Sequence, residues 1–401
     1  IYIIIMDLIG GELIGTGSSS CIFYPNIPCD NEGKRDIHDD KISKVIYHEE
    51  SEKQSKNEFK INKLVREIRG YKNWALIYDK VCNPPSINEM IQYDKQGIHD
   101  CLDDTSYEYD NFNDQSYMMV GNYGGITSDH YFRDKFNQSM SKEELEKEFI
   151  NMMKMLKPLY LGIKNLNKKG IIHNDIKYNN IVLDDNKFKL IDFGLSGTLS
   201  NNKHFKNRSI REFNTSRIYV FYPLEYILFY ASITELENEL DKIDERYHKD
   251  ELKAICYIFN YDYYETYELL VRKIQSKEIN EKEMIQKIDV YSLGILIPLL
   301  FLDTNIPYPY EGSEMISSFY MLFQKMVHPL SSERISIERA YKEFYALIRK
   351  FDKVNKRDKN NIRKKGTDQR RKNNIRKKRT DKRRKNNIKK KRTNQRRKKR
   401  V

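Results

Sequence analysis

The chain has 401 residues, of which 39% are hydrophobic, enough for one large or two ordinary domains with a buried core. Its net charge of +14 conceals two regions of opposite sign: residues 353–401 hold 27 Lys and Arg against 3 Asp, and residues 1–352 hold 45 basic against 55 acidic residues. This distribution excludes a uniformly basic protein and predicts an acidic globular body followed by a strongly basic tail.

The N-terminal stretch and the cysteines bear on location. Residues 1–9 are apolar but include Asp7, are too short to span a bilayer and lack the basic flank of a signal peptide. No other stretch is long enough for a transmembrane helix. The chain begins with Ile, so either Met6 is the true start or the sequence is a fragment. The cysteines are odd in number, scattered and without zinc spacing, so we expect free thiols in an intracellular, reducing compartment: Cys21, Cys29, Cys82, Cys101 and Cys256.

Residues 12–24 place Gly15 and Gly17 between two apolar alternations, which predicts a strand, a tight turn and a returning strand. Glycines let the backbone approach a phosphate closely, where its N–H groups can donate hydrogen bonds. Taken alone, the pattern fits an ordinary hairpin turn at least as well.

Residues 25–40 are polar and turn-rich, and we expect an insertion there. Lys44 then lies inside a short strand pattern, where a lysine is out of place unless its charge has a function or the strand lies at an edge. Lys44 is therefore the candidate for a lysine with a function in the site, and Lys41 is the alternative. Residues 49–69 are charged with helical spacing, and Glu58 shares one face with Ile61 and Val65. Glu58 is the candidate partner of Lys44, and an ordinary solvated glutamate is the alternative.

Residues 82–115 match no regular element and are expected to form an inserted loop between two strands. The apolar run 117–120 and the glycine-containing run 121–125 then predict a buried strand and a turn. Ser141 opens a capping box, S-K-E-E, before a helix that ends near Gly170.

The segment 171–194 contains the strongest motif. Asp175, Lys177 and Asn180 follow His173 at the spacing H-x-D-x-K-x-x-N, and Asp192 comes twelve residues after Asn180. Two short apolar runs separated by Asp-Asp-Asn predict a hairpin between them, which would bring Asn180 and Asp192 together. Their oxygens are hard ligands that suit Mg²⁺ held against phosphates, with Asp175 facing the same site.

This segment resembles the catalytic loop and metal-binding segment of eukaryotic-type protein kinases. The resemblance implies an α+β, two-lobed fold over residues 8–351, with a β-rich N-lobe at about 8–120, a helical C-lobe at about 125–351 and a helical insertion at about 231–286. It implies ATP and Mg²⁺ as cofactors and protein serine/threonine hydroxyls as acceptors. The serine/threonine assignment depends on Lys177 within D-I-K-x-x-N.

The resemblance assigns roles residue by residue. Asp175 would orient and deprotonate the acceptor hydroxyl, and Lys177 would stabilise charge on the γ-phosphate. Asn180 and Asp192 would hold Mg²⁺. Lys44, positioned by Glu58, would bind the α- and β-phosphates. Met119 would lie behind the adenine. The remaining ATP-binding candidates are the glycine-rich turn and two hinge positions: Ile14, Gly15, Thr16, Gly17, Ser18, Ser19, Ser20, Cys21, Ile22, Val120 and Asn122.

Further kinase-like positions follow in order. Tyr222-Pro223-Leu224-Glu225 resembles the end of an activation segment, and Lys287 to Gly294 the start of the central C-lobe helix. The family pattern implies that Asp289 binds the catalytic-loop backbone and that Glu225 pairs with Arg334. Ser200, Ser209, Thr215 and Ser216 are candidates for phosphorylation.

Three departures from the family pattern stand out. Ser20 replaces the third glycine, Asn62 replaces an apolar residue, and Asn174 replaces the arginine that often pairs with an activating phosphate. Short motifs such as C-I-F-Y-P and Y-P-x-E resemble kinases of large nucleocytoplasmic DNA viruses, which implies the host cytoplasm, the nucleus or the virion.

Residues 360–398 repeat with a period of 13 and contain one isoleucine per repeat. So little apolar surface predicts disorder. The charge of residues 353–401 predicts binding of nucleic acid or another polyanion. An expansion without a selected role is the alternative. For the whole chain, the alternatives to a kinase are an inactive kinase-like scaffold and a nucleic-acid-binding protein.

Overall fold

The computed structural model describes residues 11–17, 20–32, 36–47, 51–103, 116–136, 140–215, 219–240, 256, 258–302 and 312–352. The chain divides into two units, Ile1–Tyr345 and Ala346–Val401, and the features below belong to the first. The predicted disorder of residues 353–401 concerns a part of the chain outside the described residues.

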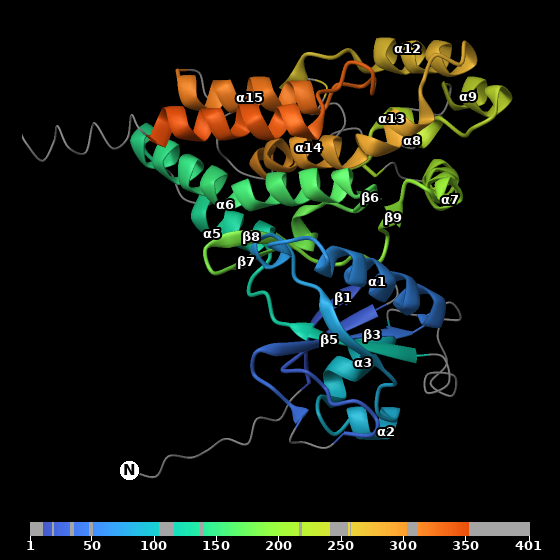
Figure 1. The fold of residues 1–401 in the computed structure, drawn as a ribbon, viewed down its shortest axis with the longest axis vertical. Coiled ribbons are helices and arrows are strands. Elements are labelled where there is room, and N and C mark those ends of the chain that lie inside the picture. Colours follow the sequence, from blue (N-terminus) through green and yellow to red (C-terminus); the bar gives the residue numbers. More distant parts are fainter. Residues whose placement is uncertain are drawn as a thin grey trace, which may run out of the picture. The chain divides into compact units, whose positions relative to one another are not determined.

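The first unit as far as Asn122 is built on one antiparallel sheet with the strand order β1-β2-β3-β5-β4. One helix, α1 (Ser51–Arg66), packs against β3, β4 and β5. Figure 1 shows this helix lying across the sheet. The strands are β1 (Glu12–Gly17), β2 (Ser20–Tyr24), β3 (Lys41–Tyr47), β4 (Tyr78–Cys82) and β5 (Ser116–Asn122).

The expected loop at 82–115 is wrong in part, because it contains two short helices, α2 (Ile87–Met90) and α3 (Lys95–Asp103). Ser86 opens α2 with a capping box that the sequence reading overlooked. Apolar residues of both helices join a cluster with β2 and β3: Phe23, Val45, Ile87, Met90 and Ile98. Residues 104–115 of this stretch lie outside the described residues.

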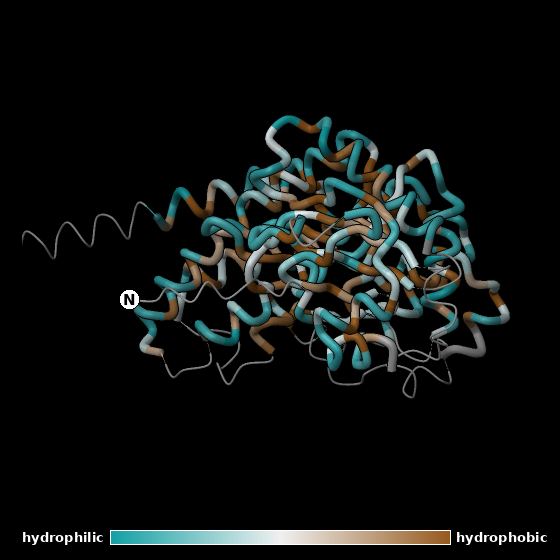
Figure 2. The backbone as a smooth tube through the Cα atoms, turned by 90° about the horizontal axis from the view of Figure 1, so that it is seen from below, coloured by the Kyte–Doolittle hydropathy of each residue, from teal (hydrophilic) through white to brown (hydrophobic). Residues whose placement is uncertain are grey.

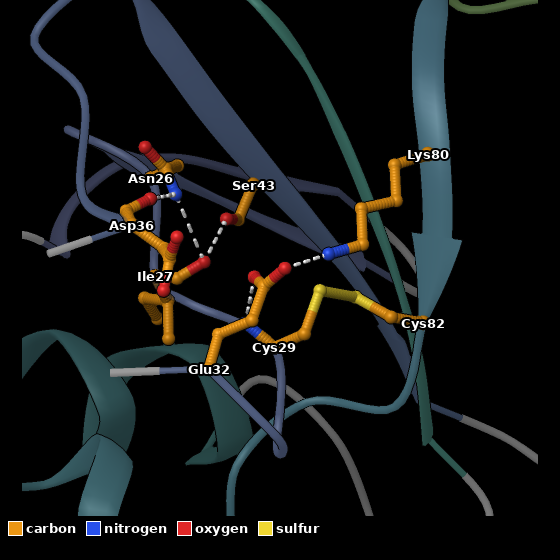
Figure 3. The surroundings of a disulfide bond; sticks show 8 residues. All are labelled: Asn26, Ile27, Cys29, Glu32, Asp36, Ser43, Lys80 and Cys82. Carbon is orange, nitrogen blue, oxygen red and sulfur yellow. Dashed lines mark hydrogen bonds and ion pairs between the residues drawn. A yellow bond between two sulfur atoms is a disulfide. The ribbon is translucent and has the colours of Figure 1, made fainter. Parts of the chain in front are cut away.

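The expectation of free thiols is wrong for four of the five cysteines. Cys21 in β2 is bonded to Cys101 in α3, and Cys29 after β2 is bonded to Cys82 at the end of β4. Figure 3 shows the second disulfide, beside which Glu32 pairs with Lys80. Only Cys256 is free. The cysteines therefore give no support to the expectation that the protein is located in a reducing compartment.

Helices dominate the first unit after β5. The capping box at Ser141 is confirmed: its hydroxyl accepts from the backbone N–H of Glu144, and Gly170 follows the helix with φ of 70°. The helix α14 is apolar all round and buried over nearly its whole length, as a central helix must be. Figure 2 shows apolar stretches of the chain interleaved with hydrophilic ones, many of them toward the middle of the view. The helices are α5 (Ser128–Phe136), α6 (Lys142–Lys168), α14 (Ile288–Leu302) and α15 (Glu314–Met326).

The hairpin predicted inside 171–194 is confirmed. Strands β7 (Ile181–Asp184) and β8 (Lys187–Leu190) pair in register, and Asp185 and Asn186 both have positive φ, as a two-residue hairpin turn requires. A second short antiparallel pair, β6 (Ile171–Ile172) with β9 (Gly197–Thr198), joins the start of this segment to the residues just after its end.

The expected helical insertion at 231–286 is mainly helical over its described residues, with turns between the helices. It contains α9 (Ile233–Leu240), α12 (Tyr263–Gln275) and α13 (Glu281–Gln286). Together with α7 (Asn202–Phe213) and α8 (Leu224–Leu228) these helices bury one apolar cluster around Tyr226, Tyr267 and Ile285. The insertion is thus part of the packed core, with Tyr267 Oη donating to the carbonyl oxygen of Leu236 at 3.0 Å. No helix of the described residues is long and apolar enough to cross a membrane.

Candidate active site

Asp175 lies at the centre of the site and is almost fully buried. Its Oδ2 accepts from Asn180 Nδ2 at 2.7 Å and lies 3.3 Å from Lys177 Nζ. Its Oδ1 accepts from the hydroxyl of Tyr219 at 3.0 Å. Both carboxylate oxygens are therefore engaged, Oδ2 by two residues of the H-x-D-x-K-x-x-N pattern and Oδ1 by a tyrosine from outside it.

A second buried carboxylate holds the backbone of this loop. Asp289, in the first turn of α14, accepts from the N–H groups of His173 at 2.7 Å and Asn174 at 2.9 Å, the role that the family resemblance implied. Burial raises the pKa of Asp289, although His173 and the two backbone donors counteract it. Asn174 has φ of 61°, a conformation that asparagine tolerates better than most residues. Asp289 therefore stabilises the left-handed turn immediately before Asp175.

Asn180 and Asp192 are brought together by the hairpin. The N–H of Ile191 donates to the carbonyl oxygen of Asn180 at 3.0 Å, which places Asp192 one residue beyond that contact. The amide nitrogen of Asn180 is directed at Asp175, to both its Oδ2 and its carbonyl oxygen, so the remaining Asn180 Oδ1 is an acceptor. A carboxylate and an amide oxygen, with phosphates completing the shell, are a donor set that fits Mg²⁺.

Lys44 joins two carboxylates from distant parts of the chain. Its Nζ lies 3.1 Å from Glu58 Oε2 in α1 and 2.9 Å from Asp192 Oδ1. Glu58 also accepts from the N–H of Phe193 at 3.2 Å. The predicted Lys44–Glu58 pair is present, and the contact with Asp192 was not anticipated. Lys41 pairs instead with Asp79 at the surface, so the structure favours Lys44 over the alternative.

The charges of this cluster shift one another's titration. Burial lowers the pKa of Lys44, but Asp192 and Glu58 together raise it well above its usual value. Burial raises the pKa of Asp192, and Lys44 outweighs that effect, so that it falls to about 2. For Glu58 burial prevails over Lys44, and its pKa rises to about 7. The lysine therefore stays charged, whereas Glu58 titrates near neutral pH.

The glycine-rich hairpin lies directly beside Lys44. In the sheet register Ile22 of β2 faces Lys44, which in turn faces Met119 of β5. The turn candidates lie in β2, the neighbour of β3, and in β1 beyond it, with Ser18 and Ser19 outside the described residues: Ile14, Gly15, Thr16, Gly17, Ser20, Cys21 and Ile22. Val120 and Asn122 follow Met119 along β5, and Met119 is fully buried.

Several residues near Asp175 were not found by sequence reasoning. The hydroxyl of Tyr222 donates to the carbonyl oxygen of Asn174 at 2.6 Å and accepts from Arg208 Nε at 3.2 Å. Arg208 lies on α7 and pairs with Glu212 at 2.9 Å. An arginine from a later helix therefore supports, through Tyr222, the loop that contains Asp175. The cluster of aromatic residues at 219–226 was the only signal for this network in the sequence.

The candidate phosphorylation sites differ in exposure. Ser209 is fully buried and donates to the carbonyl oxygen of Tyr226 at 2.7 Å, so it is inaccessible in this state. Ser200 is exposed, Thr215 donates to the carbonyl oxygen of Glu212, and Ser216 lies outside the described residues.

The implied pair of Glu225 and Arg334 is present. Arg334 Nη2 lies 3.4 Å from Glu225 Oε2, and both side chains are buried. Ser331 also binds Glu225, through its N–H at 2.9 Å and its hydroxyl at 2.8 Å. This cluster ties the end of the activation-segment-like stretch to the turn that follows α15.

Comparison with known proteins gives a family match and several short local matches. Residues 11–220 match the protein kinase domain family. Two Xenopus laevis proteins, the hormonally up-regulated neu tumor-associated kinase homologs A and B, are 46% identical to this chain over 44 residues, as is the Xenopus tropicalis homolog. That segment covers 11% of this chain and only 6–7% of the relatives' length.

Proposed function

Because this chain belongs to the protein kinase family, we propose that it transfers the γ-phosphate of ATP to serine and threonine hydroxyls of proteins, with Mg²⁺ as the metal ion. One observation carries this proposal: Lys44 contacts both Glu58 and Asp192, while Asn180 and Lys177 contact Asp175. The two contact sets contain the lysine, the carboxylates and the amide that such a transfer uses, and degenerate kinase-like scaffolds usually lack at least one of them.

The positions of these side chains suggest how they act. Lys44, with its pKa raised, offers a permanent positive charge to the α- and β-phosphates beneath the glycine-rich hairpin. Asp192 and Asn180 Oδ1 would hold Mg²⁺, which, when bound, neutralises charge on the phosphates. Asp175 would orient the acceptor hydroxyl and take up its proton. Lys177, 3.3 Å from Asp175, would lie near the transferred phosphate and supports the serine/threonine assignment.

Acceptor specificity is tested with the full chain, radiolabelled ATP and casein, followed by acid hydrolysis and separation of the phosphoamino acids. We expect phosphoserine and phosphothreonine and no phosphotyrosine. The same reaction with EDTA in place of Mg²⁺ should give no transfer. A product that is mainly phosphotyrosine would refute the serine/threonine assignment but not the assignment of protein kinase activity.

The Asp192→Asn variant should require a much higher Mg²⁺ concentration for phosphate transfer than wild type.

We also propose that residues 353–401 bind a polyanion, because 27 basic residues against 3 acidic ones would release many counterions from a nucleic acid. Deletion of these residues should abolish salt-sensitive retention of the protein on a DNA column and leave phosphotransfer to casein unchanged. Equal retention of both proteins would show that the tail is not the binding element.

We also propose, from the short motifs above, that the chain is related to viral kinases. Its location would then be the host cytoplasm, the nucleus or the virion.

A further inference from the structure

The hydroxyl of Tyr219 occupies a position that an acceptor needs. It donates a hydrogen bond to Asp175 Oδ1 at 3.0 Å. A general base must lie within about 2.6–3.2 Å of the hydroxyl oxygen whose proton it takes. Since Asn180 and Lys177 already contact Oδ2, Oδ1 is the oxygen left for an acceptor. In this structure a hydroxyl of the chain itself is bonded there.

Packing on neighbouring rings holds Tyr219 at this point. Its ring centroid lies 5.5 Å from that of Phe221 and 5.1 Å from that of Tyr222, and the Lys177 ammonium lies 5.9 Å from it. Tyr222 is fixed in turn by Asn174 and Arg208, as described above. Burial, and then the charge of Asp175, raise the pKa of Tyr219, so its hydroxyl keeps the donated proton at neutral pH.

We infer that Tyr219 is an internal competitor for the acceptor site: a serine or threonine of a protein substrate reaches Asp175 only after the Tyr219 hydroxyl has left Oδ1. This inference rests on the proposed function. The opposing interpretation is that Tyr219 merely positions Asp175 for catalysis. The two interpretations predict opposite kinetics. A competitor raises the acceptor KM and leaves kcat unharmed, whereas a positioning residue supports kcat.

Two variants of the full chain separate these interpretations. Tyr219→Phe keeps the ring and removes only the hydrogen bond to Asp175, and Tyr219→Ala removes the whole occupant. With casein as the acceptor at saturating ATP, we expect the casein KM to fall by about tenfold in Tyr219→Phe, since a hydrogen bond to a charged group is lost. The fall should be at least as large in Tyr219→Ala, with kcat unchanged or higher and the ATP KM unchanged. A lower kcat with an unchanged casein KM would overturn the inference.

Tyr226→Phe is the matched control, because its hydroxyl donates to the carbonyl oxygen of Phe205 and not to Asp175. It should leave the casein KM unchanged. Thermal unfolding of each variant identifies any loss of folding, in which case Tyr219→Phe, the smaller change, decides the question.

A measurement without turnover separates failure of the inference from failure of the proposed function. Fluorescence anisotropy of labelled casein reports acceptor binding directly, with an ATP analogue present. Tighter casein binding by Tyr219→Phe and Tyr219→Ala than by wild type supports the competitor even if no protein transfers phosphate. Equal affinities overturn it even if transfer is robust.

Discussion

The Lys44 ammonium in β3 lies 3.1 Å from Oε2 of Glu58 in α1, and both side chains are almost fully buried. The two residues are 14 positions apart, and only the packing of α1 on the sheet brings them together. Asp192 joins them from the C-terminal half, 148 residues beyond Lys44. Lys44 therefore contacts both carboxylates only when α1 and the segment around Asp192 are both in position.

Titration of Glu58 should make ATP use depend on pH. Its pKa of about 7 means that it gains a proton, and loses its attraction for Lys44, as the pH falls through neutrality. We expect kcat/KM for ATP to fall by about tenfold from pH 8 to pH 6, because the charged fraction is about a tenth at one unit below the pKa. Glu58→Gln should show a low value that changes little over this range, and that variant also controls for titration of ATP itself. Identical pH profiles for the two proteins would contradict this role of Glu58.

Asn62 is expected to weaken α1. It lies one turn after Glu58, is fully buried, and neither its amide nitrogen nor its amide oxygen has a hydrogen-bond partner among the described residues. An unsatisfied buried polar group costs about 1–3 kcal/mol. Asn62→Leu should therefore raise the free energy of unfolding in urea by about 1–2 kcal/mol. Lys60→Leu, an exposed change in the same helix, should stay within about 0.5 kcal/mol of wild type. A destabilised Asn62→Leu would show that the amide has a partner or that Leu does not fit.

The disulfides can be counted chemically. When the unreduced chain is unfolded in guanidinium and treated with iodoacetamide, we expect one alkylated cysteine, Cys256. After reduction all five should react. Peptide mapping should recover Cys21 linked to Cys101 and Cys29 linked to Cys82. Five alkylated cysteines before reduction would instead restore the expectation from the sequence.

The buried pair of Glu225 and Arg334 should be costly to break singly. Removing one partner leaves an unpaired buried charge, for which the typical loss is about 3–5 kcal/mol of unfolding free energy. We therefore expect large losses in urea for Glu225→Gln and for Arg334→Met. The double variant should lose less than the sum of the two, because neither charge is then left unpaired. Strict additivity would mean that the 3.4 Å contact contributes no coupling and that Ser331 alone satisfies Glu225.

Much of the site could be predicted from the sequence because its residues lie in local patterns. The hairpin between Asn180 and Asp192 follows from two short apolar runs around a polar turn, and the α6 capping box from four consecutive residues. The positions of Asp289 and Arg334 came from the family resemblance, since neither spacing nor periodicity identifies a partner more than a hundred residues away. Local patterns thus predicted elements, and the resemblance predicted their long-range contacts.

The remaining features depend on tertiary packing that no local pattern encodes. Cys21 and Cys101 are 80 residues apart, and only the packing of α3 beside β1 and β2 makes them neighbours. The contact between Tyr219 and Asp175 spans 44 residues, and tyrosine at that position is not part of the motifs that were recognised. Arg208 was overlooked because the polar stretch after Gly194 did not indicate a helix there.

Phosphate transfer by the full chain tests the central claim most directly. Wild type and Asp175→Asn are compared in the transfer of labelled phosphate from ATP to casein with Mg²⁺, because the substitution removes the carboxylate with little change in shape. The account predicts transfer by wild type, a loss of at least about a hundredfold in Asp175→Asn, and similar ATP binding by both. Transfer that survives in Asp175→Asn, or ATP binding without transfer in wild type, would contradict the assignment of Asp175 as the catalytic base of an active kinase.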